Sequence, residues 1–97
     1  MKETIESIVT SHFGVTSEQV RMRGRGPQEI TDARHFLWYF LCFVMGYKTD
    51  AVAKEYNTTQ RNVNYSITLI RDGIQIQPSF ARHCAEITKQ LKEYNLL

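Results

Sequence analysis

The chain has 97 residues, of which 42% are hydrophobic and 23% charged, and its 12 Lys and Arg against 10 Asp and Glu give a net charge of +2. This composition predicts one soluble domain over residues 1–97, and the lack of a GxxxxGK[ST] loop excludes a P-loop ATPase. The longest apolar run, 36–45, falls short of the ~20 residues of a membrane span, and the N-terminus has no basic and apolar leader, so we expect a cytoplasmic protein without a membrane partner.

Two helices are predicted at the start of the chain. Apolar residues recur at helical spacing over 4–12, and Gly14 is placed to end this first helix as a C-terminal cap. Thr16 followed three residues later by Gln19 has the pattern of a capping box. This pattern predicts a second, short helix through Val20.

A basic segment follows, and we call residues 21–27 the arginine loop. It contains Arg21, Arg23 and Arg25, alternating with Met and Gly, and it ends in a proline. Such a segment cannot continue a helix, and its charge is exposed. A flexible basic finger of this kind suits a narrow minor groove of DNA, where the potential is most negative. A solvated surface loop is the alternative interpretation.

The longest predicted helix begins at about Gln28 or Ile30 and ends at Met45, before Gly46. Between 36 and 45 it is apolar nearly all round. A helix of this kind is covered by other helices on most sides. We therefore expect it to be the central helix of the domain.

Two more helices are predicted on either side of a turn. Thr49 can cap a helix through Tyr56, and Asn57 can adopt the left-handed conformation that ends it. Thr58 or Thr59 can then cap the next helix.

The chain is predicted to close with a loop and a final helix. The helix that begins after Thr58 or Thr59 is expected to run to about Asp72 and to end at Gly73. Residues 74–78 are expected to be a loop, because Pro78 and the lack of a partner strand argue against a strand. The last helix is expected over about 79–94. The prediction is an all-α, compact six-helix domain.

The helices around Asn57 have the pattern of a helix-turn-helix. Ala53, Asn57 and Val63 supply a small contact residue, a turn residue and an apolar anchor at offsets of four and six residues. The second helix then begins with polar side chains, at the end that usually meets base edges in the major groove. The candidate base-reading residues are Gln60, Arg61, Asn62, Asn64 and Tyr65. The candidate phosphate-binding residues of this unit are Lys54, Thr58 and Thr59.

The distribution of charge favours the same part of the chain. Residues 21–71 contain eight basic and four acidic side chains, whereas residues 1–20 carry a net charge of −2 and residues 72–97 are balanced. Arg34 belongs to the basic part, where it either contacts phosphate, which we favour, or pairs with Asp32 or Glu29. The alternative for the polar helix start is an ordinary solvated surface.

Several segments resemble one known family, the C-terminal DNA-binding domain (domain IV) of the bacterial replication initiator DnaA. Residues 13–20, with the sequence FGVTSEQV, are similar to the family's opening motif. The arginine loop follows, then Ala33-Arg34-His35 at the start of the long helix, and residues 52–56 stand where the family has its "IG..F" segment. The resemblance extends over about residues 8–91.

The resemblance implies a fold of the domain IV, or Trp-repressor-like, type. It implies that the chain binds double-stranded DNA, in replication or transcription control, with Arg23 or Arg25 in the minor groove and the helix-turn-helix in the major groove. The family's Asp-His pair is absent from 58–63, that stretch is one residue shorter, and the family's Gly is Ala53. The ATPase domain of the initiator is also absent, so its initiator activity is not implied.

The alternative function is a protein–protein interaction domain that kept this fold and lost DNA binding. Its surface would include the aromatic residues Trp38, Tyr39 and Phe43, which are too many to bury fully in a small domain. A single small module makes few DNA contacts, so a homodimer or a second DNA-binding protein is a further expected partner.

No enzyme activity, cofactor or metal site is expected. No set of acid, base and nucleophile converges in the sequence, and His12, His35 and His83 have no metal-ligand spacing. Cys42 and Cys84 are expected to be small core residues on apolar helix faces.

Overall fold

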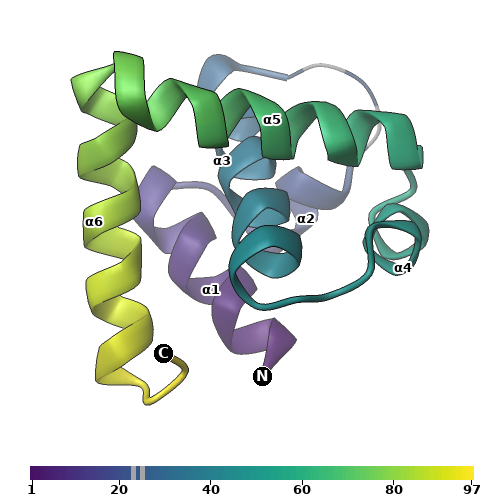
Figure 1. Ribbon diagram of the computed structural model, residues 1–97. Helices are drawn as coiled ribbons and strands as arrows, with labels where there is room; N and C mark the ends of the chain where they lie inside the picture. The colour runs from purple at the N-terminus through teal and green to yellow at the C-terminus, as the bar shows by residue number, and fades with distance from the viewer. Residues whose placement is uncertain (23, 25) are drawn as a thin grey trace.

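The computed structural model describes residues 1–22, 24 and 26–97, in which the regular secondary structure is entirely helical (Figure 1). The helices are α1 (Lys2–Phe13), α2 (Ser17–Arg21), α3 (Gln28–Tyr39), α4 (Thr49–Glu55), α5 (Gln60–Ile76) and α6 (Pro78–Glu93), and a π-helical turn, η1 (Phe40–Val44), extends α3. Helix α3 passes through the centre, α5 crosses one end of the molecule and α6 runs down one side (Figure 1). Both termini lie at the end opposite α5 (Figure 1). The all-α prediction is confirmed.

The end of α1 and the start of α2 lie where local sequence signals place them, whereas α2 also includes Arg21, which was predicted to lie in the arginine loop. Gly14 follows α1 with φ 69°, a left-handed conformation that glycine adopts without steric cost. The Thr16 hydroxyl accepts a hydrogen bond from the Gln19 backbone N–H at 3.1 Å, and the Gln19 side chain accepts one from the Thr16 N–H at 2.9 Å. The predicted capping box is therefore confirmed.

Helix α3 is central, as its sequence predicts. Its buried side chains, with those of η1, form the middle of one hydrophobic cluster; they include Phe36, Leu37, Phe40 and Leu41. The helix is covered on most sides, as predicted, and Phe43, which is 54% exposed, lies on the side that is not covered. The Phe43 ring lies on the outer side of the π-helical turn and stacks on Tyr39, with ring centroids 5.3 Å apart.

The connection between α4 and α5 differs from the prediction at one end. Lys48, not Thr49, is the N-cap of α4, and its side chain makes no capping bond. Thr49 instead lies in the first turn, where its hydroxyl accepts a hydrogen bond from Gln60 at 2.8 Å. Asn57 has φ 53°, as predicted for the turn, and Thr59 rather than Thr58 caps α5.

The predicted end of α5 at Gly73 and the loop over 74–78 are wrong, because α5 continues to Ile76. The missing side chain of Gly73 serves packing between helices. A Cβ atom at Gly73 would lie 2.3 Å from the Phe80 ring of α6. Only Gln77 separates the two helices, and Pro78 occupies the first turn of α6, where its missing N–H costs nothing.

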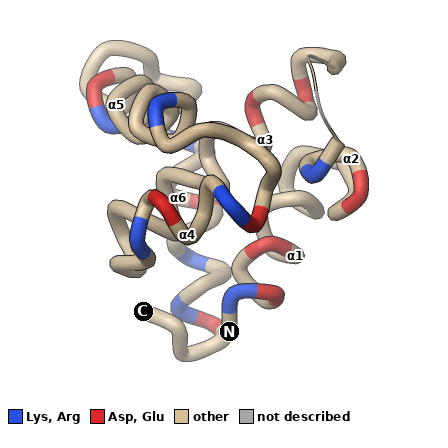
Figure 2. Tube along the Cα trace, turned by 90° about the vertical axis from the view of Figure 1, so that its right-hand side faces the viewer, with Lys and Arg blue, Asp and Glu red and all other residues tan. Residues whose placement is uncertain are grey.

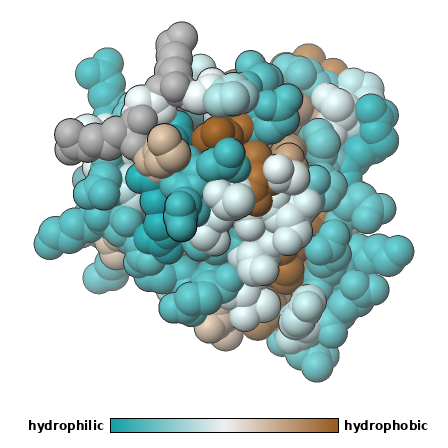
Figure 3. Space-filling view, turned by 180° about the vertical axis from the view of Figure 1, so that it is seen from behind, coloured by the Kyte–Doolittle hydropathy of each residue, from teal (hydrophilic) through white to brown (hydrophobic). Residues whose placement is uncertain are grey.

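The face of the molecule seen from behind is mainly polar, with hydrophobic residues in small areas between hydrophilic ones (Figure 3). In the part of the chain that the structure describes, no helix has the length and apolar character needed to cross a membrane.

Candidate nucleic-acid interface

The outer face of α5 carries a stripe of polar side chains. The inward face of this helix is formed by Val63, Ser66 and Ile70, which are buried. On the opposite face, at helical spacing, lie the exposed residues Arg61, Asn64, Tyr65 and Thr68, which we call the α5 stripe. Thr68 was not among the residues predicted from the sequence, although its spacing from Arg61 and Asn64 could have identified it. Helix α5 crosses the end of the molecule, so this stripe faces outward (Figure 1).

Two of the predicted base-reading side chains stabilise the helix start instead. The Gln60 amide donates to the Thr49 hydroxyl at 2.8 Å, and the Asn62 amide donates to the Thr58 hydroxyl at 3.0 Å. The Asn62 backbone N–H also donates to the Thr59 hydroxyl at 3.1 Å, which is the N-cap bond. Thr58 and Thr59, predicted to bind phosphate, therefore accept hydrogen bonds within the protein.

The remaining candidates have unoccupied polar groups. Among the described residues, Arg61, Asn64 and Tyr65 form no side-chain hydrogen bond or ion pair with protein groups, and Tyr65 is 61% exposed. Lys54 is exposed in the last turn of α4, close to the start of α5 in the chain. Figure 2 shows basic positions on both α4 and α5. The start of α5 thus presents a cation, an amide and a phenol to solvent.

His35 of α3, which had no predicted role at this site, contacts the inward side of α5. The His35 Nδ1 atom of α3 lies 2.7 Å from the Ser66 hydroxyl, which in turn donates to the Asn62 carbonyl at 3.1 Å. Because the Ser66 hydroxyl donates its hydrogen to the Asn62 carbonyl, it must accept from His35, whose Nδ1–H is therefore the donor. The His35 ring also lies edge-on to the Tyr65 ring, with ring centroids 6.0 Å apart. Burial lowers the pKa of His35. His35 therefore helps to orient the α5 stripe as a neutral side chain.

Arg21, predicted to lie in the arginine loop, and Arg34 of α3 both bind protein groups. Arg21 donates to Glu6 at 2.8 Å and to Glu55 at 3.1 Å. Arg34 donates to backbone carbonyls at the end of α2 and the start of the arginine loop, and among the described residues it pairs with neither Asp32 nor Glu29. Arg23 and Arg25 lie outside the described residues.

Arg21 belongs to a partly buried polar cluster that sequence reasoning missed. Glu6 of α1 is buried, and besides Arg21 it accepts a hydrogen bond from the Tyr56 hydroxyl at 2.5 Å. Glu55 also accepts a bond from Lys2 at 2.5 Å, and this bond holds the pKa of Glu55 below its usual value. The cluster joins α1, α2 and the end of α4. A lone Glu on the inward face of α1 is the one sequence signal for it.

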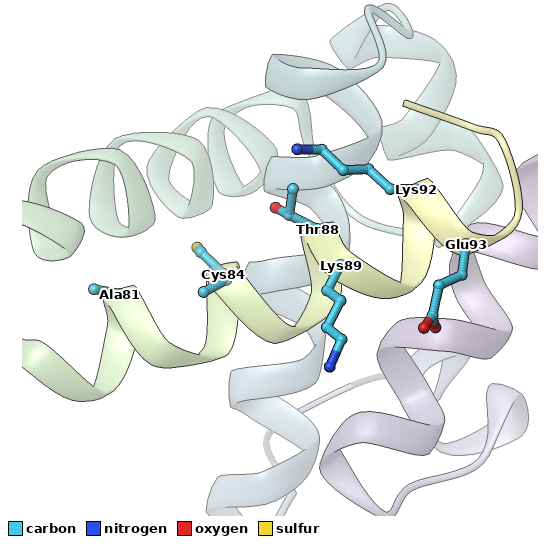
Figure 4. Close-up of a pocket in the computed structure, with 7 residues that line it drawn as sticks. Ala81, Cys84, Thr88, Lys89, Lys92 and Glu93 are labelled. Atoms are coloured by element: carbon cyan, nitrogen blue, oxygen red, sulfur yellow. The ribbon is translucent and has the colours of Figure 1, made fainter.

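Other surfaces offer little chemistry. An open hollow of about 730 Å³ runs along α6, lined by small side chains and by Lys89, Lys92 and Glu93 (Figure 4). No group of three or more His, Cys, Asp or Glu side chains among the described residues could hold a metal ion. Cys42 and Cys84 are free and half-buried, and burial raises the pKa of each thiol to about 11.

Comparison of the chain with known protein families and with curated proteins finds no match.

Proposed function

We propose that this chain binds double-stranded DNA, with α4 and α5 acting as a helix-turn-helix whose second helix enters the major groove. The observation that carries the proposal is the α5 stripe, which presents Arg61, Asn64 and Tyr65 to solvent beside the start of α5. This is the end of a recognition helix that contacts base edges in helix-turn-helix proteins.

The side chains of the stripe suit base edges. The Arg61 guanidinium can donate two parallel bonds to guanine, and the Asn64 amide can donate to and accept from adenine. Tyr65 and Thr68 offer hydroxyl groups and apolar atoms for thymine. Lys54 and the N-terminal N–H groups of α5 suit phosphate.

The arginine loop supplies the second half of the proposed interface. Arg23 and Arg25 follow α2 in the sequence, and they are the candidates for the minor groove. A domain of this size makes few base contacts, so tight specific binding would draw on a second copy or on a second DNA-binding protein.

The proposal is tested by replacing Arg61. The Arg61→Ala variant should weaken binding to a selected duplex by about 1–3 kcal/mol and relax its sequence preference. Binding is measured by fluorescence anisotropy after selection from a random duplex library. Arg82→Ala, an exposed arginine on α6, is the control with the same change in charge. Equal effects of both variants on affinity and preference would contradict the proposed reading role.

One observation favours a second function, a protein-interaction domain. Phe43 is 54% exposed and stacks on Tyr39, so an aromatic ring is available at the surface for contact with an apolar side chain of a partner. Trp38 and Tyr39, which were also expected on this interaction surface, are buried. Sedimentation of wild type and of Phe43→Ser, read together with duplex binding, distinguishes this function. Self-association that the substitution abolishes, in a protein that binds no duplex at low salt, would favour it over DNA binding.

A further inference from the structure

The side chain of Arg34 lies at the root of the arginine loop. From the middle of α3 its Nε atom donates to the Val20 carbonyl at 3.1 Å, and its Nη1 atom donates to the Gly24 carbonyl at 2.7 Å. Its Nη2 atom donates to the Gln19 carbonyl at 3.2 Å and also to the Met22 carbonyl. One guanidinium thus joins the end of α2 to both described parts of the loop root.

These acceptors lie at and beyond the end of a short helix. Helix α2 has five residues, and the last carbonyls of a helix have no N–H partner within it, although the Gln19 carbonyl also accepts the Met22 backbone N–H at 3.3 Å. The carbonyls at a helix C-terminus also carry partial negative charge, which attracts a cation. A planar guanidinium has five donors in a fixed fork, whereas a lysine ammonium is a point charge that cannot span four carbonyls. The geometry therefore requires arginine and not merely a positive charge.

The next residue in the chain connects the same helix to α5. His35 donates to Ser66 of α5 and contacts Tyr65 of the α5 stripe. Consecutive residues of α3 therefore hold the two parts of the proposed interface, Arg34 the loop root and His35 the helix. Arg23 and Arg25 directly follow Met22 and Gly24, whose carbonyls Arg34 binds.

We propose that Arg34 is a positioning residue that fixes the root of the arginine loop to α3, rather than a phosphate ligand. The expected effect of Arg34 on DNA affinity rests on the proposed function. A fixed loop root would present the cations of the loop to the same duplex that α5 contacts. It differs from the expectation drawn from the sequence, in which Arg34 itself contacts phosphate.

Two substitutions at Arg34 separate positioning from charge. Arg34→Lys keeps the charge and loses the fork, whereas Arg34→Gln loses both. If Arg34 positions the loop, both variants should weaken DNA binding about tenfold and lower the slope of log K against log salt by about one. If Arg34 binds phosphate, the lysine variant should keep most of the affinity, and that result would overturn the proposal. Arg82→Lys is the control.

A second measurement does not depend on DNA. Trypsin under native conditions reports local opening at arginine residues, and mass spectrometry locates the cut. Loss of the charged hydrogen bonds should speed cleavage within residues 21–25 about tenfold in both Arg34 variants, with cleavage in α6 unchanged. Unchanged cleavage within 21–25 would overturn the proposal.

The two measurements also separate this inference from the proposed function. Absence of DNA binding by the wild-type protein would contradict the proposed function, and the trypsin rates would still decide whether Arg34 holds the loop root. Faster cleavage with normal DNA affinity in both variants would show that the fixed root is unnecessary for binding, and would overturn the positioning role.

Discussion

At the scale of single residues, Gly73 shows how a missing side chain positions two helices. In the middle of a helix, glycine costs about 1 kcal/mol relative to alanine. Here the absent Cβ makes room for the Phe80 ring, which would otherwise lie 2.3 Å away. The close approach of α5 and α6 depends on this contact, and both helices contribute to the hydrophobic core.

We predict that Gly73→Ala destabilises the protein even though alanine favours helix formation. Moving the Phe80 ring in a packed core should lower the free energy of unfolding by about 1–3 kcal/mol. Urea denaturation measures the change, with Gln75→Ala, an exposed position in the same turn of α5, as the control. A stabilised Gly73→Ala variant would show that Phe80 has room to move.

At the scale of helices, the buried cluster around Glu6 joins α1, α2 and α4. The Tyr56 hydroxyl and the Arg21 guanidinium share one oxygen of the Glu6 carboxylate, at 2.5 and 2.8 Å. The guanidinium also lies over the Tyr56 ring, 4.7 Å from its centroid. Because Tyr56 directly precedes the turn into α5, this cluster fixes the turn against the rest of the domain.

The contribution of the cluster can be measured with Tyr56→Phe. The variant keeps the ring and removes one hydrogen bond to a charged group, which should lower the free energy of unfolding by about 1.5–3 kcal/mol. Tyr94→Phe, at an exposed tyrosine, is the matched control. A loss for Tyr56→Phe no greater than for this control would mean that the hydroxyl is equally well solvated in the unfolded chain.

A pair of histidines makes the contact between α1 and α6 sensitive to pH. His12 Nε2 and His83 Nδ1 lie 2.8 Å apart, so one nitrogen donates and the other accepts. Burial lowers the pKa of His12 in the folded protein; the charge of His83 adds to this effect and Glu86 opposes it. The folded protein therefore binds the proton more weakly than the unfolded chain does.

The sign of the pH effect follows from this difference. The contribution of His12 to the free energy of unfolding is fully present above the ordinary histidine pKa of about 6.5. It decreases as the pH falls from there toward the lower pKa of the folded state. We expect the Tm to decrease between about pH 7.5 and pH 5.5, and to decrease less in His12→Gln. Burial also lowers the pKa of His35, but His35 is present in both proteins, so its effect on the Tm is the same in each. Identical pH dependence in the two proteins would contradict the role of the pair.

At the scale of the whole molecule, the features that local sequence determines could be predicted. The capping box at Thr16, the left-handed turn at Asn57 and the central helix each depend on neighbouring residues or on hydrophobic periodicity. The exposed polar start of α5 belongs to this class, because it follows from the cap at Thr59 and the anchor at Val63.

The contacts between distant segments could not be predicted. Arg21 binds Glu55, 34 positions away, and the Glu6–Tyr56 bond joins residues 50 positions apart. The sequence shows that these side chains are charged or polar, but not which partner each one meets. The same limit applies to Gly73, whose role depends on the Phe80 ring of another helix.

DNA binding is tested most directly by fluorescence anisotropy of a labelled duplex titrated with the wild-type protein at low and moderate salt. One duplex contains the binding site of the replication initiator DnaA, and the other has a scrambled sequence. We predict binding that weakens as salt increases, because cations of the α5 stripe and the arginine loop displace counterions from phosphate. Absence of binding to both duplexes at low salt would contradict the proposed function.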